Sequence, residues 1–488
     1  MMKTLGLVIV CGLAGIGLWF WQSADRSASA QPFDAPRVSP DVLPDMSFDR
    51  IRQAGLENAC YPDTDHHVAE FLYQHPDACF WTLDVAGERV SALPVPSPPA
   101  DAVRLPAPSG RDDTAMIQRV VDANPGGAIV GQGVYRVEGL HLAEPIDIFD
   151  MPMIVASANT ADGGSGVVVV IDAPDVRLFD SPVNAAGSPS VHTGYQVRSG
   201  ADRFTLVGGG FLDALHRDGR NVAGVTVRGA DDIHLACNRF ERIVNDTDDS
   251  TLTARANAIL LNGGGEDTIS GGIIANNTAL EHQSNGKRQD AEFLTIQSYA
   301  ATDAAQPLRV FANRTVDAGK RFTKHQQSDA LVLSNDTEWR DKAGPLGDRK
   351  LQAHVEIQFS DNVIARNNRM KVGADSRFDY LFTTDVHVGD RRQSNVHYDC
   401  NDIEVTDALD PASGNKPHVI VARASRQPRG SVDRVASGSS ANGNRVHGEG
   451  SVSHHFWFGE GYPDDGGEFE HRDNLFDIPA LKGAFKTP

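Results

Sequence analysis

The sequence predicts an all-β fold in which one chain winds through stacked parallel strands, a single-stranded parallel β-helix. The first observation is an internal repeat: residues 322–337, FTKHQQSDALVLSNDT, recur as HVEIQFSDNVIARNNR at residues 354–369. The overlay pairs Lys324 with Glu356, Gln326 with Gln358, Ser328 with Ser360, Asp329 with Asp361 and Asn335 with Asn367. Self-similarity built from short alternating apolar runs, without helical periodicity, is typical of stacked β coils.

The second observation is an asparagine that marks the same point of each repeat. The set comprises Asn238, Asn276, Asn313, Asn335, Asn367 and Asn401. The steps between them are unequal, which indicates loops of different length inserted on a shared coil. We expect these side chains to stack and to pass amide hydrogen bonds along the solenoid, where they hold the turns.

Composition agrees with this fold class and excludes some functions. The chain has 488 residues, of which 40% are hydrophobic, only 7% are aromatic and 46 are glycine. The strand-like segments follow one another without interleaved helices, as in an all-β solenoid. The formal net charge of −20 argues against general affinity for nucleic acid or for an anionic membrane.

Residues 1–30 carry an export signal. Lys3 precedes an apolar run over residues 5–21, and Ala28-Ser29-Ala30 forms a small-residue cleavage site. The run is long for a cleaved signal and short for a comfortable membrane span, so either a signal peptide or an uncleaved N-terminal anchor fits. In both cases we expect the body of the protein to be periplasmic or secreted.

The cysteines fit an oxidising compartment. Cys60 and Cys79 lie close together in the sequence and form the candidate disulfide. Cys237 and Cys400 each precede a marker asparagine, and we expect them to be small buried residues of distant coils. The sequence contains no CxxC pair and no HExxH motif, so nothing indicates a zinc site.

The chain divides into five predicted parts. After residues 1–30 come a small lead segment at 31–90, a proline-rich linker at 91–110, the β-helix at 111–407, and C-terminal coils or a cap at 408–488. Directly after the linker, Asp113 or Thr114 can cap a short helix that Pro125 and Gly126 end. Its apolar stripe comprises Met116, Ile117, Val120 and Val121. We expect this helix to plug the open end of the solenoid.

The start of the β-helix resembles a known superfamily. Residues 112–115 (DDTA), Ile117-Gln118, Gly126-Gly127 and Gly133-Val134-Tyr135 are similar to the N-terminal cap and first coil of the pectate-lyase-like superfamily of right-handed parallel β-helices, which also carries asparagine ladders. Its members include polysaccharide lyases, glycoside hydrolases, uronate epimerases and phage tailspikes, so the resemblance implies the fold and leaves the reaction open. The reaction motifs of individual subfamilies are absent from the sequence.

The repeat predicts two polar lanes on the outer face of one sheet, because side chains alternate across a strand and coils stack about 4.8 Å apart. The first lane consists of Arg198, Arg228, Asn262, Gln297, Gln326 and Gln358. The second lane, two residues earlier in each coil, consists of Gln196, Thr226, Leu260, Thr295, Lys324 and Glu356. We interpret the first lane as a substrate-binding surface for a sugar chain, while the alternative is an inert polar strand face.

The candidate catalytic residues are Lys320, Arg321, Lys324, His325 and Glu356. Lys324 faces outward and can take the C5 proton of a uronate, with Arg321 or Lys320 steadying the carboxylate. The alternatives are a salt bridge from Lys324 to Glu356 and, for His325, a place in the core.

We therefore expect a monomeric protein that acts on a polysaccharide, more specifically a lyase that cleaves a uronate-containing polysaccharide by β-elimination. Three alternatives stay open: a glycoside hydrolase using two carboxyl groups, a uronate C5-epimerase, and a non-catalytic protein that binds an exopolysaccharide during export. No cofactor is indicated with certainty, and assistance by Ca²⁺ is left open.

Overall fold

The computed structural model describes residues 79–83, 90–93, 95–156, 166–217, 219–247, 251, 254–262, 269–286, 290–297, 307–326, 328–340, 343–348, 353–358, 360–372, 380–386, 394–406, 418–424, 438–458, 469–480 and 482–486. All of them belong to one compact unit, Leu43–Pro488. The predicted export signal at residues 1–30 and most of the lead segment lie outside these residues. Among the described residues, no helix is long and apolar enough to cross a membrane.

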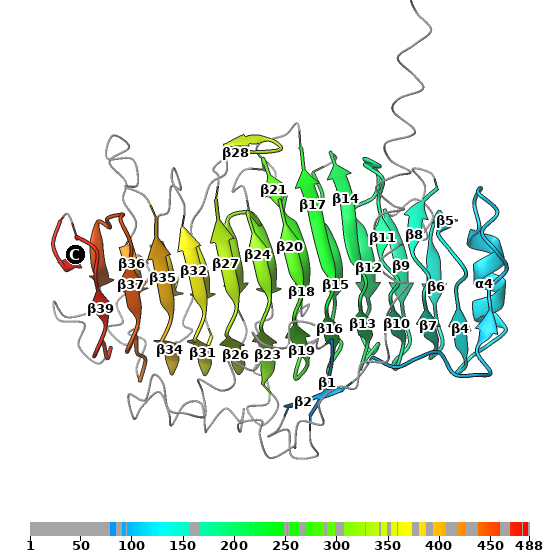
Figure 1. Ribbon diagram of the computed structural model, residues 1–488, viewed down its shortest axis with the longest axis horizontal. Helices are drawn as coiled ribbons and strands as arrows, with labels where there is room; N and C mark the ends of the chain where they lie inside the picture. Colours follow the sequence, from blue (N-terminus) through cyan, green and yellow to red (C-terminus); the bar gives the residue numbers. More distant parts are fainter. Residues whose placement is uncertain are drawn as a thin grey trace, which may run out of the picture. The chain divides into compact units, whose positions relative to one another are not determined.

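Three parallel sheets form a β-helix, as the repeat predicts, and most coils add one strand to each sheet (Figure 1). Sheet 1 has 11 strands, sheet 2 has 13 and sheet 3 has 12. Sheet 1 contains β3 (Val103–Arg104), β4 (Ala128–Val130), β7 (Asp147–Phe149), β10 (Arg177–Phe179), β13 (Thr205–Val207), β16 (His234–Ala236), β19 (Ile273–Ala275), β23 (Leu308–Phe311), β26 (Ala330–Leu333), β31 (Val363–Arg366) and β34 (Val396–Asp399).

Sheets 2 and 3 complete the coils. Sheet 2 contains β5 (Tyr135–Val137), β8 (Met153–Val155), β11 (Val183–Asn184), β14 (Gly210–His216), β17 (Arg239–Asn245), β20 (Thr278–Leu280), β21 (Gln283–Ser284), β24 (Arg314–Val316), β27 (Asp336–Trp339), β32 (Arg369–Val372), β35 (Asp402–Val405), β37 (Arg445–His447) and β39 (Leu475–Phe476). Sheet 3 contains β6 (Leu140–Leu142), β9 (Val167–Ile171), β12 (Thr193–Val197), β15 (Val222–Val227), β18 (Ala256–Asn262), β22 (Ala291–Gln297), β25 (Arg321–His325), β30 (Ala353–Gln358), β33 (Tyr380–Val386), β36 (His418–Ala424), β38 (His454–Phe458) and β40 (Phe485–Lys486).

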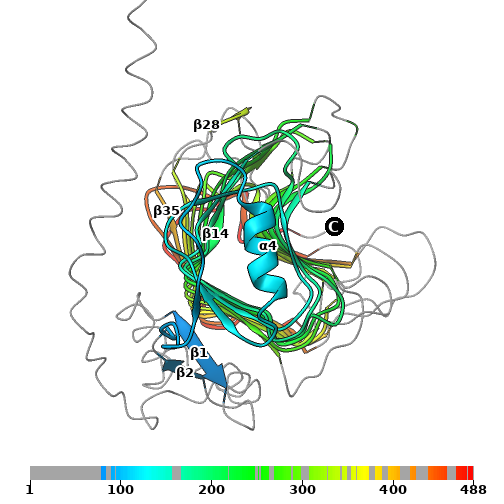
Figure 2. The same cartoon turned by 90° about the vertical axis from the view of Figure 1, so that its right-hand side faces the viewer.

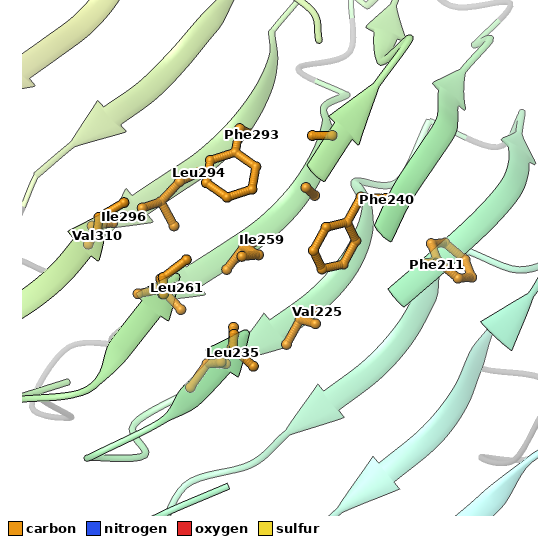
Figure 3. Packing of buried hydrophobic residues seen from close by; sticks show 14 of the residues in the cluster. Phe211, Val225, Leu235, Phe240, Ile259, Leu261, Phe293, Leu294, Ile296 and Val310 are labelled. Atoms are coloured by element: carbon orange, nitrogen blue, oxygen red, sulfur yellow. The ribbon is translucent and has the colours of Figure 1, made fainter. Parts of the chain in front are cut away.

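The interior of the coils is a continuous apolar core. Figure 3 shows Phe211, Phe240 and Phe293 pointing into it from successive coils, with aliphatic side chains between them. The aromatic stack continues from Phe293 to Phe322, whose ring centroids are 5.2 Å apart, and then to His354, 5.1 Å from Phe322. Burial lowers the pKa of His354 to about 3, so this imidazole is a neutral member of the core at physiological pH.

Helix α4 (Thr114–Asp122) lies over the first coil at the N-terminal end of the solenoid (Figure 2). Ile117 and Val121 are buried in the core, and Met116 and Val120 pack against it. The predicted plug is therefore present, with the predicted apolar stripe. Asp113 occupies the N-cap position, but its carboxylate accepts from the backbone N–H groups of Ser109 and Arg136 and makes no capping bond within the helix.

The asparagine ladder exists but runs through a different set from the predicted one. It comprises Asn238, Asn277, Asn313, Asn335, Asn368, Asn401, Asn444 and Asn474, each donating a side-chain N–H to the Oδ1 of the next. Asn276 and Asn367, which the sequence analysis assigned to the ladder, lie one residue earlier. Their φ angles are 52° and 54°, so they form the left-handed bend that precedes each ladder position.

The overlay of the two repeats is also corrected by one residue. Lys324 does pair with Glu356 in the register of sheet 3. Beyond the strand, however, Ala330 pairs with Val363, and Asn362 donates to Asp329 with an Nδ2–Oδ1 distance of 2.9 Å. The register partner of Asp329 is thus Asn362 and not Asp361, because three residues separate Gln326 from Ala330 whereas four separate Gln358 from Val363.

The predicted Cys60–Cys79 disulfide is wrong, because Cys79 is bonded to Cys237, 158 residues away. The outer face of sheet 1 carries an apolar cluster that includes Phe179, Val207 and Phe311, and Cys79 and Val95 pack against it. Packing on this face brings the lead segment beside the bend that carries Cys237. Cys400 is also disulfide-bonded. Cys237 and Cys400 are therefore not the unbonded core residues we expected.

Segments at both ends join the solenoid. The hairpin of β1 (Phe80–Leu83) and β2 (Val90–Leu93) precedes the linker, and the linker itself supplies β3, the edge strand of sheet 1. At the C-terminal end, β36 to β40 extend sheets 2 and 3, so residues after 408 contribute further coils.

Candidate functional site

The outer face of sheet 3 carries the candidate site, and the predicted lanes are present there. The register pairs Thr226 with Leu260, Leu260 with Thr295, and Thr295 with Lys324, so the second lane is continuous. A third outward row lies three residues earlier in each strand and contains Asn257, Glu292 and Arg321 in register with one another. Contacts between the rows, such as the 3.1 Å bond from Thr295 Oγ1 to Glu292 Oε2, place them on one face.

Six charged residues gather where β22, β25 and β30 are neighbours. This group, the buried charge cluster, consists of Asp290, Glu292, Lys320, Arg321, Lys324 and Glu356. Each of them is at most 6% exposed, although four lie within strands of sheet 3 and the other two, Asp290 and Lys320, directly precede a strand. Since an uncompensated charge is costly to bury, the geometry of their pairing decides what each can do.

Arg321 is the centre of the cluster. Its Nη1 lies 2.6 Å from Glu292 Oε1 and 3.1 Å from Asp290 Oδ1, and its Nε contacts Glu356 Oε2. Burial would lower the pKa of this guanidinium, but the carboxylates of Glu356, Glu292 and Asp290 raise it well above its ordinary value. Arg321 is therefore a permanent cation that ties three coils together.

Asp290 anchors the other side of the cluster. Lys320 Nζ lies 2.8 Å from its Oδ1, and Arg255 Nε lies 3.7 Å from its Oδ2. Burial alone would raise the pKa of the Asp290 carboxyl, but Arg321 and Lys320 hold it well below its ordinary value. These two cations therefore favour the ionised form of the Asp290 carboxyl.

Lys324 differs from the other cations. It stands in the second lane with its side chain 6% exposed, and within the described residues its ammonium makes no hydrogen bond and no ion pair. Burial lowers the pKa of Lys324, the field of Glu356 partly opposes this, and Arg321 lowers the pKa further. Three carboxylates in the cluster already face Arg321, Lys320 and Arg255, so charge balance does not require a proton on Lys324.

A relay of side-chain amides lies beside Lys324 in the first lane. Gln326 Nε2 donates to Gln358 Oε1 at 2.7 Å, and Gln358 Nε2 donates to Glu356 Oε1 at 2.7 Å. Gln326 and Gln358 are 6% and 4% exposed. The relay therefore links the first lane to the buried charge cluster through Glu356.

The remaining members of the first lane are more exposed. Arg198 is half-buried and its Nη1 lies 3.1 Å from Asp172 Oδ2, whereas Arg228 is exposed. Asn262 and Gln297 pair in register and are half-buried. The lane thus passes from one half-buried and one exposed arginine to buried amides as the coils approach Lys324.

Four of the predicted catalytic residues, Lys320, Arg321, His325 and Glu356, are either paired with charged groups of the protein or buried in the core. Lys320 and Arg321 are engaged with carboxylates of the protein, and Glu356 pairs with Arg321 where a bridge to Lys324 was considered. His325 points into the coil interior, fully buried, in register with Ile296 and Ile357 of the neighbouring coils. His325 is therefore a core residue and does not reach the outer face.

Sequence reasoning missed Asp290, Glu292 and Asn257. The signal was present in the aligned strands, because Glu292 and Asn257 occupy the same position of AEFLTIQ and ANAILLN, in otherwise apolar runs. A third lane drawn three residues before the second would have found them. Asp290 precedes its strand and could be found only from the structure.

The sequence predicts that two long loops, residues 300–306 and residues 339–350, form walls beside this face. Residues 300–306 lie outside the described residues. In the other loop, Trp339 is buried and donates Nε1–H to the Gly319 carbonyl, and the hairpin of β28 (Ala343–Gly344) and β29 (Gly347–Asp348) is tied to Gln283 through the N–H of Leu346. Over the described ranges, no three His, Cys, Asp or Glu side chains come together as a metal-binding group.

No protein-family model matches the sequence, and no curated protein matches it. Among solved structures, PfbA, a surface adhesin of Streptococcus pneumoniae, matches at 11% identity over 79% of this chain and 93% of that chain, with a TM-score of 0.52. The A-module of the mannuronan C-5 epimerase AlgE6 of Azotobacter vinelandii matches at 13% identity, over 75% and 96%, with a TM-score of 0.40. An alginate lyase of Paenibacillus sp. matches at 15%, over 69% and 94%, with a TM-score of 0.39.

These identities establish a likeness of fold. The chain is a right-handed parallel β-helix, as its resemblance to the pectate-lyase-like superfamily implied.

Proposed function

We propose that the protein is a polysaccharide lyase that cleaves a uronate-containing polysaccharide by β-elimination, with Lys324 as the base. One observation carries this proposal: Lys324 is a nearly buried outer-face lysine with no hydrogen bond or ion pair to the described residues, and its pKa is lowered. A lysine whose pKa is lowered in this way is suited to proton abstraction, because general bases work best when their pKa lies near the working pH.

Lys324 alone can account for both proton transfers of the β-elimination. The Lys324 amine takes the C5 proton of the uronate and becomes an ammonium. The C5–H electron pair forms the C4–C5 double bond, and the C4–O bond to the neighbouring sugar breaks. The leaving oxygen then takes a proton, which the Lys324 ammonium can return, so the lysine is neutral again.

The other five residues of the buried charge cluster support this base and are not assigned to the substrate. Arg321 holds Glu292 and Glu356, and with them the strands on both sides of Lys324. Arg321 and Lys320 do not serve the substrate carboxylate in this proposal, because both are paired with carboxylates of the protein. The amide groups of Asn262 and Gln297, half-buried in the preceding coils, are positioned to donate to it, and calcium assistance stays a prediction.

Hydrolysis is less well supported. A glycosidase needs a carboxylic acid that stays protonated near neutral pH. In the cluster, the pKa of Asp290 is lowered. Burial raises the pKa values of Asp180 and Asp232, but these residues lie at bends beside strands of sheet 1. An epimerase would use the same proton abstraction and keep the glycosidic bond intact.

We place the protein outside the cytoplasm, periplasmic or secreted, with the N-terminal segment as signal or anchor. The Cys79–Cys237 disulfide supports an oxidising compartment. A polysaccharide is the proposed partner, and a monomer the proposed state. A binding-only protein on the same fold is the second class, and the word adhesin in the name of PfbA is in keeping with it.

The test measures ultraviolet absorbance of the C4–C5 unsaturated product and release of reducing ends in parallel. The substrates are polymannuronate, polyguluronate, polygalacturonate and a neutral glucan, each with and without Ca²⁺. A rise in absorbance on a polyuronate together with new reducing ends supports the lyase. Release of reducing ends without a rise in absorbance supports a hydrolase. If neither signal changes but NMR detects altered C5 stereochemistry in the polymer, an epimerase is supported.

A further inference from the structure

The relay from Gln326 through Gln358 to Glu356 has a fixed polarity. A carboxylate paired with a guanidinium can only accept, so Gln358 must turn its NH2 group toward Glu356. This leaves the Oε1 of Gln358 as the group that faces Gln326. Gln326 must then present its own NH2 group to Gln358. The ion pair of Glu356 with Arg321 thereby dictates the orientation of an amide two links away.

This orientation leaves the side-chain oxygen of Gln326 without a hydrogen-bond donor. The Oε1 of Gln326 is buried and has no hydrogen-bond partner among the described residues. Buried polar atoms are nearly always paired, so an orphan acceptor at a fixed position marks a place where a donor belongs. Rotation of the amide cannot supply one, because it would set the carbonyl of Gln326 against the carbonyl of Gln358.

Lys324 lies two residues before Gln326 in the chain, on the same face of sheet 3. Its ammonium has no hydrogen bond or ion pair to the described residues. A nitrogen that can take a proton and an oxygen that can only accept a hydrogen bond are therefore carried by residues two apart on one face of the sheet. Their neighbours Arg321 and Glu356 are paired with each other.

We propose that Gln326 Oε1 accepts a hydrogen bond from a free hydroxyl of the sugar that Lys324 attacks, and that Gln326 is thereby a specificity-determining residue. The inference rests on the proposed function and adds the substrate class: a uronate polymer whose hydroxyls at this subsite are unmodified. An O-acyl group offers no donor and brings a carbonyl against the Oε1 of Gln326. A carboxylate at the same place would be repelled, so the substrate carboxylate lies elsewhere.

Gln358 acts as a positioning residue in this scheme. Its replacement by methionine leaves Gln326 in place but frees the amide to rotate, so that either its oxygen or its nitrogen can face the substrate. Discrimination between free and acylated sugars then falls while binding persists. Gln326→Met instead removes the acceptor and weakens binding of the free hydroxyl itself.

The experiment uses the full chain and two probes, polymannuronate and polygalacturonate, each with free hydroxyls and after chemical O-acetylation. Calorimetry gives the affinity and product absorbance gives the rate for wild type, Gln326→Met, Gln358→Met and the control Gln118→Met on helix α4. Thermal melts establish that each variant is folded. Wild type should favour one free polymer over its acetylated form by about ten-fold or more, the worth of one hydrogen bond. Gln326→Met and Gln358→Met should lose that ratio, and Gln118→Met should keep it.

The outcomes separate this inference from the lyase proposal. Discrimination in affinity that depends on Gln326, without turnover, supports hydroxyl recognition and refutes the lyase. Turnover with the same ratio in wild type and Gln326→Met supports the lyase and overturns the inference. Equal affinity of wild type for free and acetylated polymers, or binding of neither probe, also overturns it.

Discussion

Arg321 donates to Glu292 across neighbouring coils, with Nη1 2.6 Å from Oε1 and side chains that are 4% and 0% exposed. Removing one partner leaves a buried charge uncompensated. We expect Arg321→Met to lower the free energy of unfolding by about 3–5 kcal/mol. Urea unfolding followed by circular dichroism measures this change.

The matched control is Arg314→Met on sheet 2. Its guanidinium lies 4.0 Å from Asp336 and is 62% exposed. Exposed pairs of this kind contribute about 0–1 kcal/mol. Equal effects of the two substitutions would show that Arg321 does not hold the coils together.

The corrected ladder gives a second prediction. Asn277 donates Nδ2–H to Leu235 O and Asn313 Oδ1, and its Oδ1 accepts from the backbone N–H of Asn238. Asn277→Ala leaves these buried groups unpaired, at about 1–3 kcal/mol each.

Asn276→Ala is its neighbour and control. The equivalent residue of the next coil is already alanine, Ala312, at a φ of 53°, so the bend accepts this side chain. Thermal melts should place Asn277→Ala well below Asn276→Ala. A lower melting temperature for Asn276→Ala than for Asn277→Ala would indicate that Asn276 is the ladder residue.

These corrections mark what local sequence can predict. Lys324, Gln326, Glu356 and Gln358 fall in the predicted lanes because strand alternation and coil spacing fix outward positions. The sequence analysis chose Asn276 in place of Asn277 because two asparagines are adjacent there. The left-handed bend position accepts many residue types, so the residue type does not show which of the two belongs to the ladder.

Contacts between residues far apart in the sequence could not be predicted from the local sequence. Nothing in the sequence around Cys79 points to Cys237, because their proximity depends on the lead segment packing on sheet 1. Likewise, the residue types alone suggested that Arg321 and Lys320 bind the substrate carboxylate. The structure shows that Lys320 is paired with Asp290 and Arg321 with Glu292.

Acid stability tests the state of Asp290. Its folded pKa lies below the ordinary 3.8, so the unfolded chain binds the proton more readily. The stabilisation is complete above the unfolded pKa and is lost as pH falls through the folded one. Urea midpoints of wild type should fall steeply between about pH 4 and pH 2, and Asp290→Asn should flatten that slope. A wild-type slope retained in Asp290→Asn would assign the effect to other carboxyls.

The Cys79–Cys237 disulfide closes a loop across 158 residues. Its removal in a Cys79→Ser, Cys237→Ser double variant should lower the free energy of unfolding by about 2–5 kcal/mol. Mass spectrometry of non-reduced peptides should find Cys79 joined to Cys237. A peptide joining Cys60 to Cys79 would refute this connectivity.

The most direct measurement of the central claim compares lyase rates of wild type, Lys324→Met and Lys371→Met across pH on the best polyuronate. Lys371 is 46% exposed on sheet 2 and pairs with Glu404, which makes it the matched control. Wild-type activity should rise with pH as Lys324 loses its proton, at a pH below the ordinary lysine pKa of 10.5. Lys324→Met should lose about 100-fold or more in kcat, and Lys371→Met should lose none. Product formation by Lys324→Met at the wild-type rate would contradict the assignment of Lys324 as the base.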